Sequence, residues 1–171
     1  YVRDDRPWGD TTLPAVLFRY SPDRKGERPR QHLKPFAGIL QADGYAGFDR
    51  LFAAGLIEAA CWAHVRRKFY DIHIADASPI AREALERIGT LYGIEREIRG
   101  RPPNERRAVR QARAGPLVGA LHAWLHTTLA QVSAKSGLAG AIRYALTRWA
   151  ALTRYIDDGR IEIDNNAAER A

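Results

Sequence analysis

The sequence contains no methionine, one cysteine and no long apolar run. A single cysteine, Cys61, excludes an internal disulfide and is typical of a protein from a reducing compartment. The chain has no run of the roughly 20 apolar residues that a membrane-spanning helix requires. The first residues also lack a secretory signal pattern, so we expect neither a membrane partner nor export.

The first residue is Tyr1, and the last is Ala171. Since no methionine begins the chain, we expect a fragment cut at both ends from a longer protein. A processed mature chain is the alternative, but no processing signature is visible.

The composition is that of an ordinary globular protein with a basic balance. Hydrophobic residues make up 46% and charged residues 27% of the 171 residues, a length typical of one domain or of one domain with an insertion. The 27 Lys and Arg exceed the 20 Asp and Glu, which gives a formal charge of +7. This balance favours a polyanionic partner, although many unrelated proteins share it.

The N-terminal part alternates between strand and helix patterns. Apolar, β-prone stretches predict strands at 15–21, directly before Asp43, and at 56–62. Helical patterns follow the second and third strands, at about 46–54 and 64–73. This alternation predicts an α/β core with some parallel strand pairing.

From Ser78 the pattern changes to long helices with apolar stripes, which we interpret as core packed largely within this block. Ser78-Pro79 predicts a helix start, and Gly115-Pro116 predicts an interruption. A short extended piece and a final helix, capped by Asn165, follow this block. We therefore predict a core at 1–77, a helical insertion at 78–156 and a return to the core at 157–171.

Asp43 has two interpretations from the residues alone. An acidic residue at the carboxyl end of a buried α/β strand lies where such sheets usually carry their chemistry. The same side chain can instead cap the following helix. Glu169, likewise, is either a functional carboxylate or a favourable charge near a helix N-terminus.

Three motifs, in order, resemble the insertion-sequence-66 family of bacterial transposases. They are LQADGYAGFDRLF around Asp43, CWAHVRRKF at 61–69 and IEIDNNAAERA at 161–171. The resemblance implies a ribonuclease H-like fold in which two Asp and one Glu hold two divalent ions. Asp43 matches the second aspartate and Glu169 the glutamate, as catalytic and metal-binding residues. The first aspartate lies upstream of the matching region, so we expect a core without its first strand and an all-α insertion before the last helix.

The same resemblance implies Mg²⁺ or Mn²⁺ as cofactor, DNA transposon ends and target DNA as partners, a homo-oligomeric active complex and a bacterial cytoplasmic location. The complete protein would cleave and join DNA strands. Since one of three carboxylates is missing, we predict that this chain alone neither cleaves nor joins DNA. Asp4 and Asp5 lie in a predicted turn and do not match the missing motif.

Cys61 and His64 form a Cys-x-x-His pair that resembles a signature of several transposase families. A zinc site needs about four ligands, and His73, His122 and His126 show no matching pair. We therefore predict a structural role for Cys61 and His64 near the active site.

Basic residues supply candidate DNA contacts. Arg66, Arg67 and Lys68 follow His64, and Arg170 follows Glu169. A further set, Arg106, Arg110 and Arg113, falls on one helical face and could follow DNA phosphates, or be a solvated face balanced by neighbouring glutamates.

Two other functions stay open from the sequence. One is a ribonuclease H-like nuclease or resolvase. The asparagine-rich third motif, at 161–171, and the Cys-x-x-His pair argue against this function. The other is a non-catalytic DNA-binding or assembly module built on the helical block.

Overall fold

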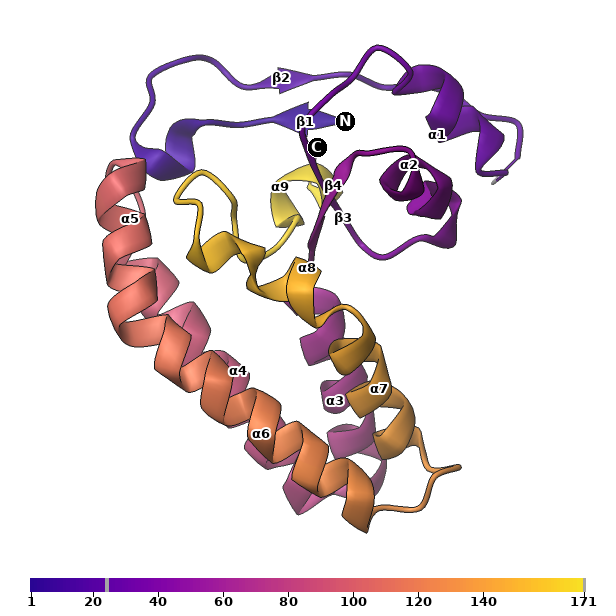
Figure 1. Cartoon of the computed structure of the whole chain (residues 1–171), viewed down its shortest axis with the longest axis vertical. Helices are drawn as coiled ribbons and strands as arrows, with labels where there is room; N and C mark the ends of the chain where they lie inside the picture. The colour runs from indigo at the N-terminus through magenta and orange to yellow at the C-terminus, as the bar shows by residue number, and fades with distance from the viewer. Residues whose placement is uncertain (24, 171) are drawn as a thin grey trace.

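The computed structural model describes residues 1–23 and 25–170. Arg24 and Ala171, the last residue of the third motif, lie outside the described residues. The chain is a mixed α/β protein that is mostly helical and has two small sheets (Figure 1). None of the helices in the described ranges combines the length and apolarity that crossing a bilayer demands.

An antiparallel pair begins the chain. Strand β1 (Val2–Arg3) pairs with β2 (Ala15–Val16), and the 3-10 turn η1 (Arg6–Trp8) lies between them. The predicted strand at 15–21 is thus much shorter, since β1 offers only two residues for pairing. Phe18 and Tyr20, beyond β2, are exposed.

A parallel pair of strands forms the second sheet, as the alternating pattern predicted. After α1 (Glu27–His32), β3 (Ile39–Ala42) pairs with β4 (Ile57–Ala60), so that Ala42 lies opposite Ala60. The crossover between these strands contains the short helices η2 (Ala46–Phe48) and α2 (Asp49–Ala53). The carboxyl ends of both strands therefore meet at one edge.

Two long helices follow the sheet. Helix α3 (Trp62–Asp76) ends at Ala77, in a left-handed conformation, and α4 (Pro79–Ile98) begins directly afterwards. The predicted start is confirmed, because Ser78 Oγ accepts the Ala81 N–H at 3.2 Å.

The predicted interruption at Gly115-Pro116 is wrong. Helix α5 (Pro103–Val109) continues through a π-helical turn, η3 (Arg110–Ala114), into α6 (Gly115–Gln131). A wider π turn directly before Pro116 accommodates the proline's missing N–H without ending the helix.

The chain then returns towards the sheet. Its remaining elements are α7 (Gly137–Thr147), α8 (Trp149–Thr153), the 3-10 turn η4 (Arg154–Ile156) and α9 (Asn166–Glu169). Asn165 is the N-cap of α9 by position, but its side chain makes no capping hydrogen bond.

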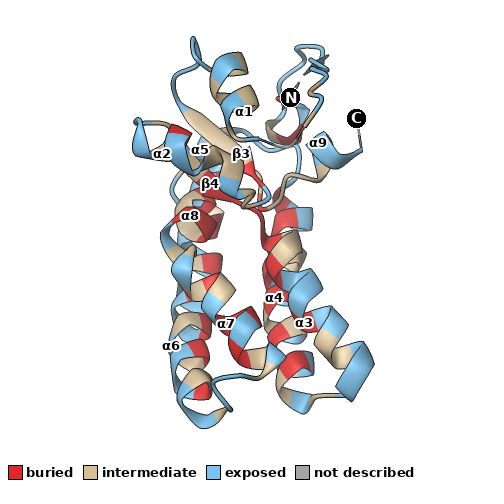
Figure 2. Ribbon diagram, turned by 90° about the vertical axis from the view of Figure 1, so that its right-hand side faces the viewer, coloured by how far each residue is buried: buried red, intermediate tan, exposed pale blue. Residues whose placement is uncertain are grey.

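One hydrophobic cluster runs from β4 through α3 into the helical block, and it also includes Ile161 and Ile163. Figure 2 shows the buried residues facing inward between α3 and α4 on one side and α6, α7 and α8 on the other. Trp62, fully buried, donates its indole N–H to the Leu152 carbonyl at 2.8 Å. The helical block therefore packs against α3 as well as against itself.

Candidate active site at the carboxyl edge of the parallel strands

Asp43 and Cys61 occupy equivalent places at the ends of neighbouring strands. Asp43 follows Ala42 of β3, and Cys61 follows Ala60 of β4, and these two alanines are paired. Since adjacent strands lie about 5 Å apart, the two residues begin side by side at one sheet edge. This edge is where parallel sheets commonly place ligands.

Glu169 contacts His64, which lies close to this end of the sheet. His64 lies in the first turn of α3, and its Nε2 is 2.9 Å from Glu169 Oε1, although 105 residues separate the two in sequence. The His64 side chain is 25% exposed and that of Glu169 40%, so the pair is accessible to solvent and ligands.

Two further hydrogen bonds hold the segment before α9 beside the sheet. The Trp62 backbone N–H donates to the Ile163 carbonyl at 3.1 Å, and Gln41 Nε2 donates to the Glu162 carbonyl at 2.6 Å. The third motif is therefore attached to both β3 and the start of α3. This attachment explains how Glu169 comes to lie beside His64.

Asp43 closes a local turn and does not cap the following helix, so the capping interpretation is wrong. Tyr45 and Phe48 are the N-cap residues of η2 and α2, and neither helix start receives a side-chain capping hydrogen bond. Asp43 Oδ1 accepts the Tyr45 N–H at 3.0 Å, and the residue is exposed. Within residues 1–23 and 25–170, no three His, Cys, Asp or Glu side chains form a group suited to hold a metal ion. Ligation by Asp43 and Glu169 therefore stays a prediction.

Cys61 is buried, as the predicted structural role requires. Only 2% of the residue is exposed, and this burial raises the pKa of the thiol. The thiol is thus kept neutral, as befits a packing residue.

Helix α7 supports the turn that carries Asp43, a role that sequence reasoning missed. Tyr144 donates its hydroxyl to the Asp43 carbonyl at 3.1 Å, and Arg148 Nη2 donates to the Gly44 carbonyl at 3.1 Å. The Arg148 guanidinium also lies 4.9 Å from the centre of the Tyr144 ring. Burial raises the pKa of Tyr144, so the hydroxyl keeps its proton and remains a donor.

Gly44 allows the side chains of Tyr144 and Arg148 to approach the turn closely. Its φ is +79°, and a Cβ at this position would lie 2.7 Å from Arg148 Nε and 3.0 Å from the Tyr144 hydroxyl oxygen. A side chain here would meet both backbone strain and the supporting residues.

Gly44→Ala is expected to lower the free energy of unfolding by about 1–3 kcal/mol, because strain and displacement of the support add together. Gly100→Ala is the matched control, since Gly100 has φ +80° and no described atom lies within 4 Å of the place that a Cβ would take. Urea unfolding of both variants measures the difference. Equal losses would show that the contact with α7 contributes nothing.

The basic residues after His64 are exposed, as a DNA contact requires. Arg66, Arg67 and Lys68 all lie on the surface of α3. Lys68 Nζ lies 4.6 Å from the centre of the Tyr144 ring, at a surface hollow that Arg143 also lines. Arg170 is exposed beside Glu169.

The predicted arginine stripe is wrong for two of its three members. Arg106 and Arg110 are 1% and 0% exposed, so neither can reach a DNA phosphate in this fold. Arg110 donates to both carboxylate oxygens of Glu95, at 2.9 and 2.6 Å, and Arg106 pairs with Glu95 and Glu162. Buried guanidinium groups need such partners, and these carboxylates supply them.

Arg113, the third member of the stripe, is exposed but paired. It donates to both carboxylate oxygens of Glu97, and this bond holds the pKa of Glu97 below its ordinary value. These three arginines therefore mainly form ion pairs within the protein, with Glu95, Glu97 and Glu162, and we call this set of ion pairs the brace.

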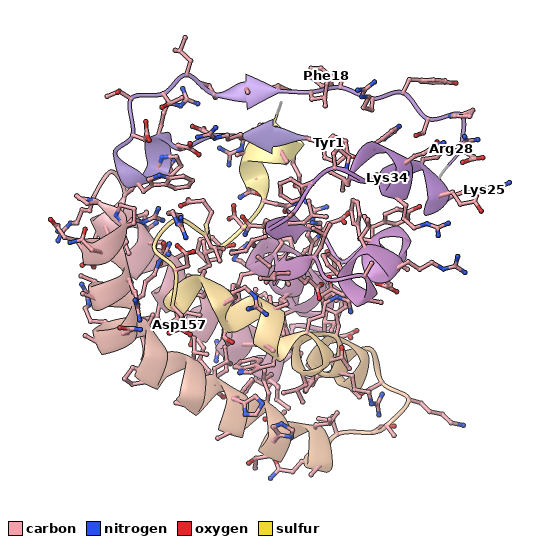
Figure 3. The ribbon with its side chains drawn as sticks, turned by 45° about the horizontal axis from the view of Figure 1, so that its top comes forward. Tyr1, Phe18, Lys25, Arg28, Lys34 and Asp157 are labelled. Carbon is pink, nitrogen blue, oxygen red and sulfur yellow. The ribbon has the colours of Figure 1, made fainter. Side chains whose placement is uncertain are left out.

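A second surface hollow, of about 330 Å³, lies at the N-terminal end of the molecule. Figure 3 shows Tyr1 and Phe18 on neighbouring segments, with Lys25 and Arg28 towards α1. All four line the hollow, and Asp23 lies 3.5 Å from Arg28. The mixture of aromatic and basic groups was not foreseen, because these residues come from separate short segments.

Comparisons with known proteins give a consistent result. A sequence model described as "Transposase IS66 family" matches residues 1–171. Among the similar curated proteins of Sinorhizobium fredii (strain NBRC 101917 / NGR234), "Uncharacterized protein y4qI" is 44% identical over 179 residues and "Uncharacterized protein y4hP" 42% over 190 residues. Both alignments cover 100% of this chain, and it spans about a third of each relative, 33% and 34%. No solved structure matches.

Proposed function

The chain belongs to the IS66 family of transposases, and from this premise we propose that it forms part of a catalytic domain that cleaves and transfers DNA strands. Asp43 and Glu169 are the active-site carboxylates of this proposal. The observation that carries it is the 2.9 Å contact between His64 and Glu169, at the strand edge where Asp43 lies.

The proposal includes a ribonuclease H-like core. The parallel pair of β3 and β4, with an acidic residue after the first strand and a helix after the second, supports it. The predicted division at residues 77/78 and 156/157 belongs to the same proposal, with the helical block as an insertion between β4 and the glutamate.

The donor chemistry fits a hard divalent cation. Asp43 and Glu169 would hold Mg²⁺ or Mn²⁺ through carboxylate oxygens, which such ions prefer. A pair of such ions stabilises both the attacking and the leaving oxygen of an in-line displacement at phosphorus. The described residues offer two of the three carboxylates that the family resemblance implies.

Neighbouring side chains hold the two proposed carboxylates in position. His64, in the first turn of α3, orients the Glu169 carboxylate through the 2.9 Å contact between Nε2 and Oε1. Tyr144 and Arg148 fix the turn that presents Asp43. A rigid support of this kind holds catalytic groups in position before the DNA arrives.

Exposed basic residues near the site would contact DNA phosphates. Arg66, Arg67 and Lys68 lie on the helix that carries His64, and Arg170 follows Glu169. These contacts are independent of base sequence and weaken as salt rises. The active complex of the proposal is a homo-oligomer on transposon ends and target DNA, in the bacterial cytoplasm.

Metal removal tests the proposal. In the complete natural protein, EDTA is expected to abolish DNA strand cleavage and transfer, while salt-dependent DNA binding remains. Addition of Mg²⁺ or Mn²⁺ in excess of the chelator restores cleavage, as gel analysis of end-labelled DNA would measure.

Cleavage that persists in EDTA would contradict the proposal. DNA binding without any cleavage, under every metal condition, would favour the non-catalytic assembly module instead. Preferential cleavage of RNA–DNA hybrids or four-way junctions would favour the nuclease or resolvase.

A further inference from the structure

The hollow of about 330 Å³ at the N-terminal end of the molecule, which we call the N-terminal hollow, collects aromatic rings from separate segments. Tyr1 directly precedes β1 and Phe18 follows β2, whereas Tyr45 and Phe48 belong to the crossover between β3 and β4 (Figure 3). Phe18 is 76% exposed and Tyr1 39%, so both rings are accessible to a ligand. The volume lies within the range of roughly 300–1,000 Å³ that is typical of small-ligand sites.

Close backbone packing holds the wall of the hollow that the crossover forms. The Tyr45 and Phe48 rings pack edge-on, with their centres 5.5 Å apart. A Cβ on Gly47 would collide with the Tyr45 ring, and one on Gly26 would lie 2.9 Å from the Gly47 carbonyl oxygen. The two glycines thus allow the start of α1, the crossover and the Tyr45 ring to approach one another closely. A wall fixed in this way loses little conformational freedom when a ligand binds.

Positive charge is in excess around the hollow. Among the described residues that line it, Arg19, Lys25 and Arg28 outnumber one carboxylate, Asp23. Asp23 lies 3.9 Å from Lys25 Nζ and 3.5 Å from Arg28 Nε, so one carboxylate is shared between two of these cations. Aromatic faces beside an excess of cations are the composition of sites for unpaired nucleic acid, in which bases stack on the rings and phosphates meet the cations.

The hollow adjoins the candidate active site through one turn. Tyr45, which lines the hollow, donates its backbone N–H to Asp43 Oδ1 at 3.0 Å. One ring of the hollow is therefore two residues from a proposed catalytic carboxylate. Within a duplex every base is stacked and paired, so a base reaches a protein ring only after it leaves the stack. This location favours unpaired nucleotides close to the cleaved phosphate.

We propose that the N-terminal hollow binds unpaired nucleotides of the DNA strand at the candidate active site. Phe18 and Tyr1 stack on the bases, and Lys25 and Arg28 contact the phosphates. The inference rests on the proposed function, because it identifies the ligand as part of the DNA substrate. It adds a single-strand site to the phosphate contacts proposed for α3.

The test measures DNA binding by the complete natural protein in EDTA, where no cleavage is expected. The probe is a fluorescently labelled oligonucleotide of about 10 nucleotides, within the site size of roughly 4–16 nucleotides of single-strand modules, and its duplex serves for comparison. Phe18→Ala is expected to weaken single-strand binding about 5- to 150-fold, the effect of losing one base–aromatic stack, and to leave duplex binding unchanged. Fluorescence anisotropy measures both affinities.

Tyr20→Ala is the matched control. Tyr20 lies two residues after Phe18 and is 89% exposed, but it does not line the hollow, so we expect unchanged affinity. Phe18→Trp keeps a stacking surface and is expected to retain single-strand binding. Lys25→Gln is expected to reduce the slope of log K against log salt by about 0.7, the contribution of one phosphate contact on a single strand. Since Phe18 and Tyr20 are exposed, we expect their variants to fold normally, and circular dichroism checks this.

Equal single-strand affinities of Phe18→Ala and Tyr20→Ala would overturn the inference, as would equal losses of Phe18→Ala on single strand and duplex, or no single-strand binding by the wild type. Binding in EDTA does not depend on cleavage, so the two proposals fail separately. Metal-dependent cleavage with full single-strand binding by Phe18→Ala removes the hollow alone. Loss of single-strand binding in Phe18→Ala, in a protein that cleaves DNA under no metal condition, removes the catalytic proposal and keeps the hollow as a single-strand site.

Discussion

Replacement of Asp43 by asparagine is expected to reduce DNA strand cleavage by the complete natural protein at least about 10²–10³-fold, the loss caused by removal of one group that stabilises transition-state charge. The amide keeps the size of the side chain and can still accept the Tyr45 N–H, which Asp43 Oδ1 accepts at 3.0 Å. The turn is thus retained, and only the negative charge that would bind a cation is lost.

Glu169→Gln is expected to behave in the same way, since its carboxylate is the other proposed ligand and its contact with His64 can persist. Asp49→Asn is the matched control, because Asp49 is an exposed carboxylate in the neighbouring helix α2. Cleavage rates of end-labelled DNA, with DNA affinity measured in parallel, check the prediction. An Asp43→Asn variant as active as Asp49→Asn would remove Asp43 from the active site.

Arg110→Ala is expected to lower the free energy of unfolding by about 3–5 kcal/mol, the typical result of breaking a buried ion pair by removing one partner. Glu95 is only 9% exposed, and both of its carboxylate oxygens accept hydrogen bonds from Arg110. Arg110 Nη1 also donates to the carbonyls of Tyr155 and Asp158, at 2.8 and 3.0 Å. The substitution removes the donor from both carbonyls and, among the described residues, leaves Glu95 with only the longer contact from Arg106, at 3.4 Å.

Arg107→Ala is the control for this prediction. Arg107 lies three residues earlier, in α5, and is exposed, so its loss is expected to change stability by no more than about 0.5 kcal/mol. Urea unfolding measures both variants. If the two unfold at the same urea concentration, the buried brace does not stabilise this fold.

A double-mutant cycle with Glu95→Leu separates the pair from its surroundings. The variant Arg110→Met combined with Glu95→Leu is expected to be more stable than the sum of the single losses implies, because no unpaired charge remains buried. Additive losses would mean that Arg110 acts mainly through the Tyr155 and Asp158 carbonyls.

The brace also connects the helical block to the candidate site. Arg106 pairs with Glu162, whose carbonyl accepts the Gln41 side chain beside β3. Arg106, which was predicted to contact DNA, is thus placed to hold the third motif against the sheet.

The sequence by itself determined the features that depend on neighbouring residues. The cap at Ser78, the strand before Asp43 and the exposure of Arg66, Arg67 and Lys68 follow from local chemistry and periodicity. The three motifs indicated the family, because the order and spacing of motifs can be read directly from the sequence.

Only the tertiary structure decided which long-range partners meet. An arginine stripe has the same helical spacing whether it faces solvent or carboxylates such as Glu95, so burial of Arg106 and Arg110 could not be read from periodicity. Tyr144 supports Asp43 across 101 residues, and His64 meets Glu169 across 105. Such contacts depend on how the sheet and helices pack, because chain separation alone places no constraint on which side chains become neighbours.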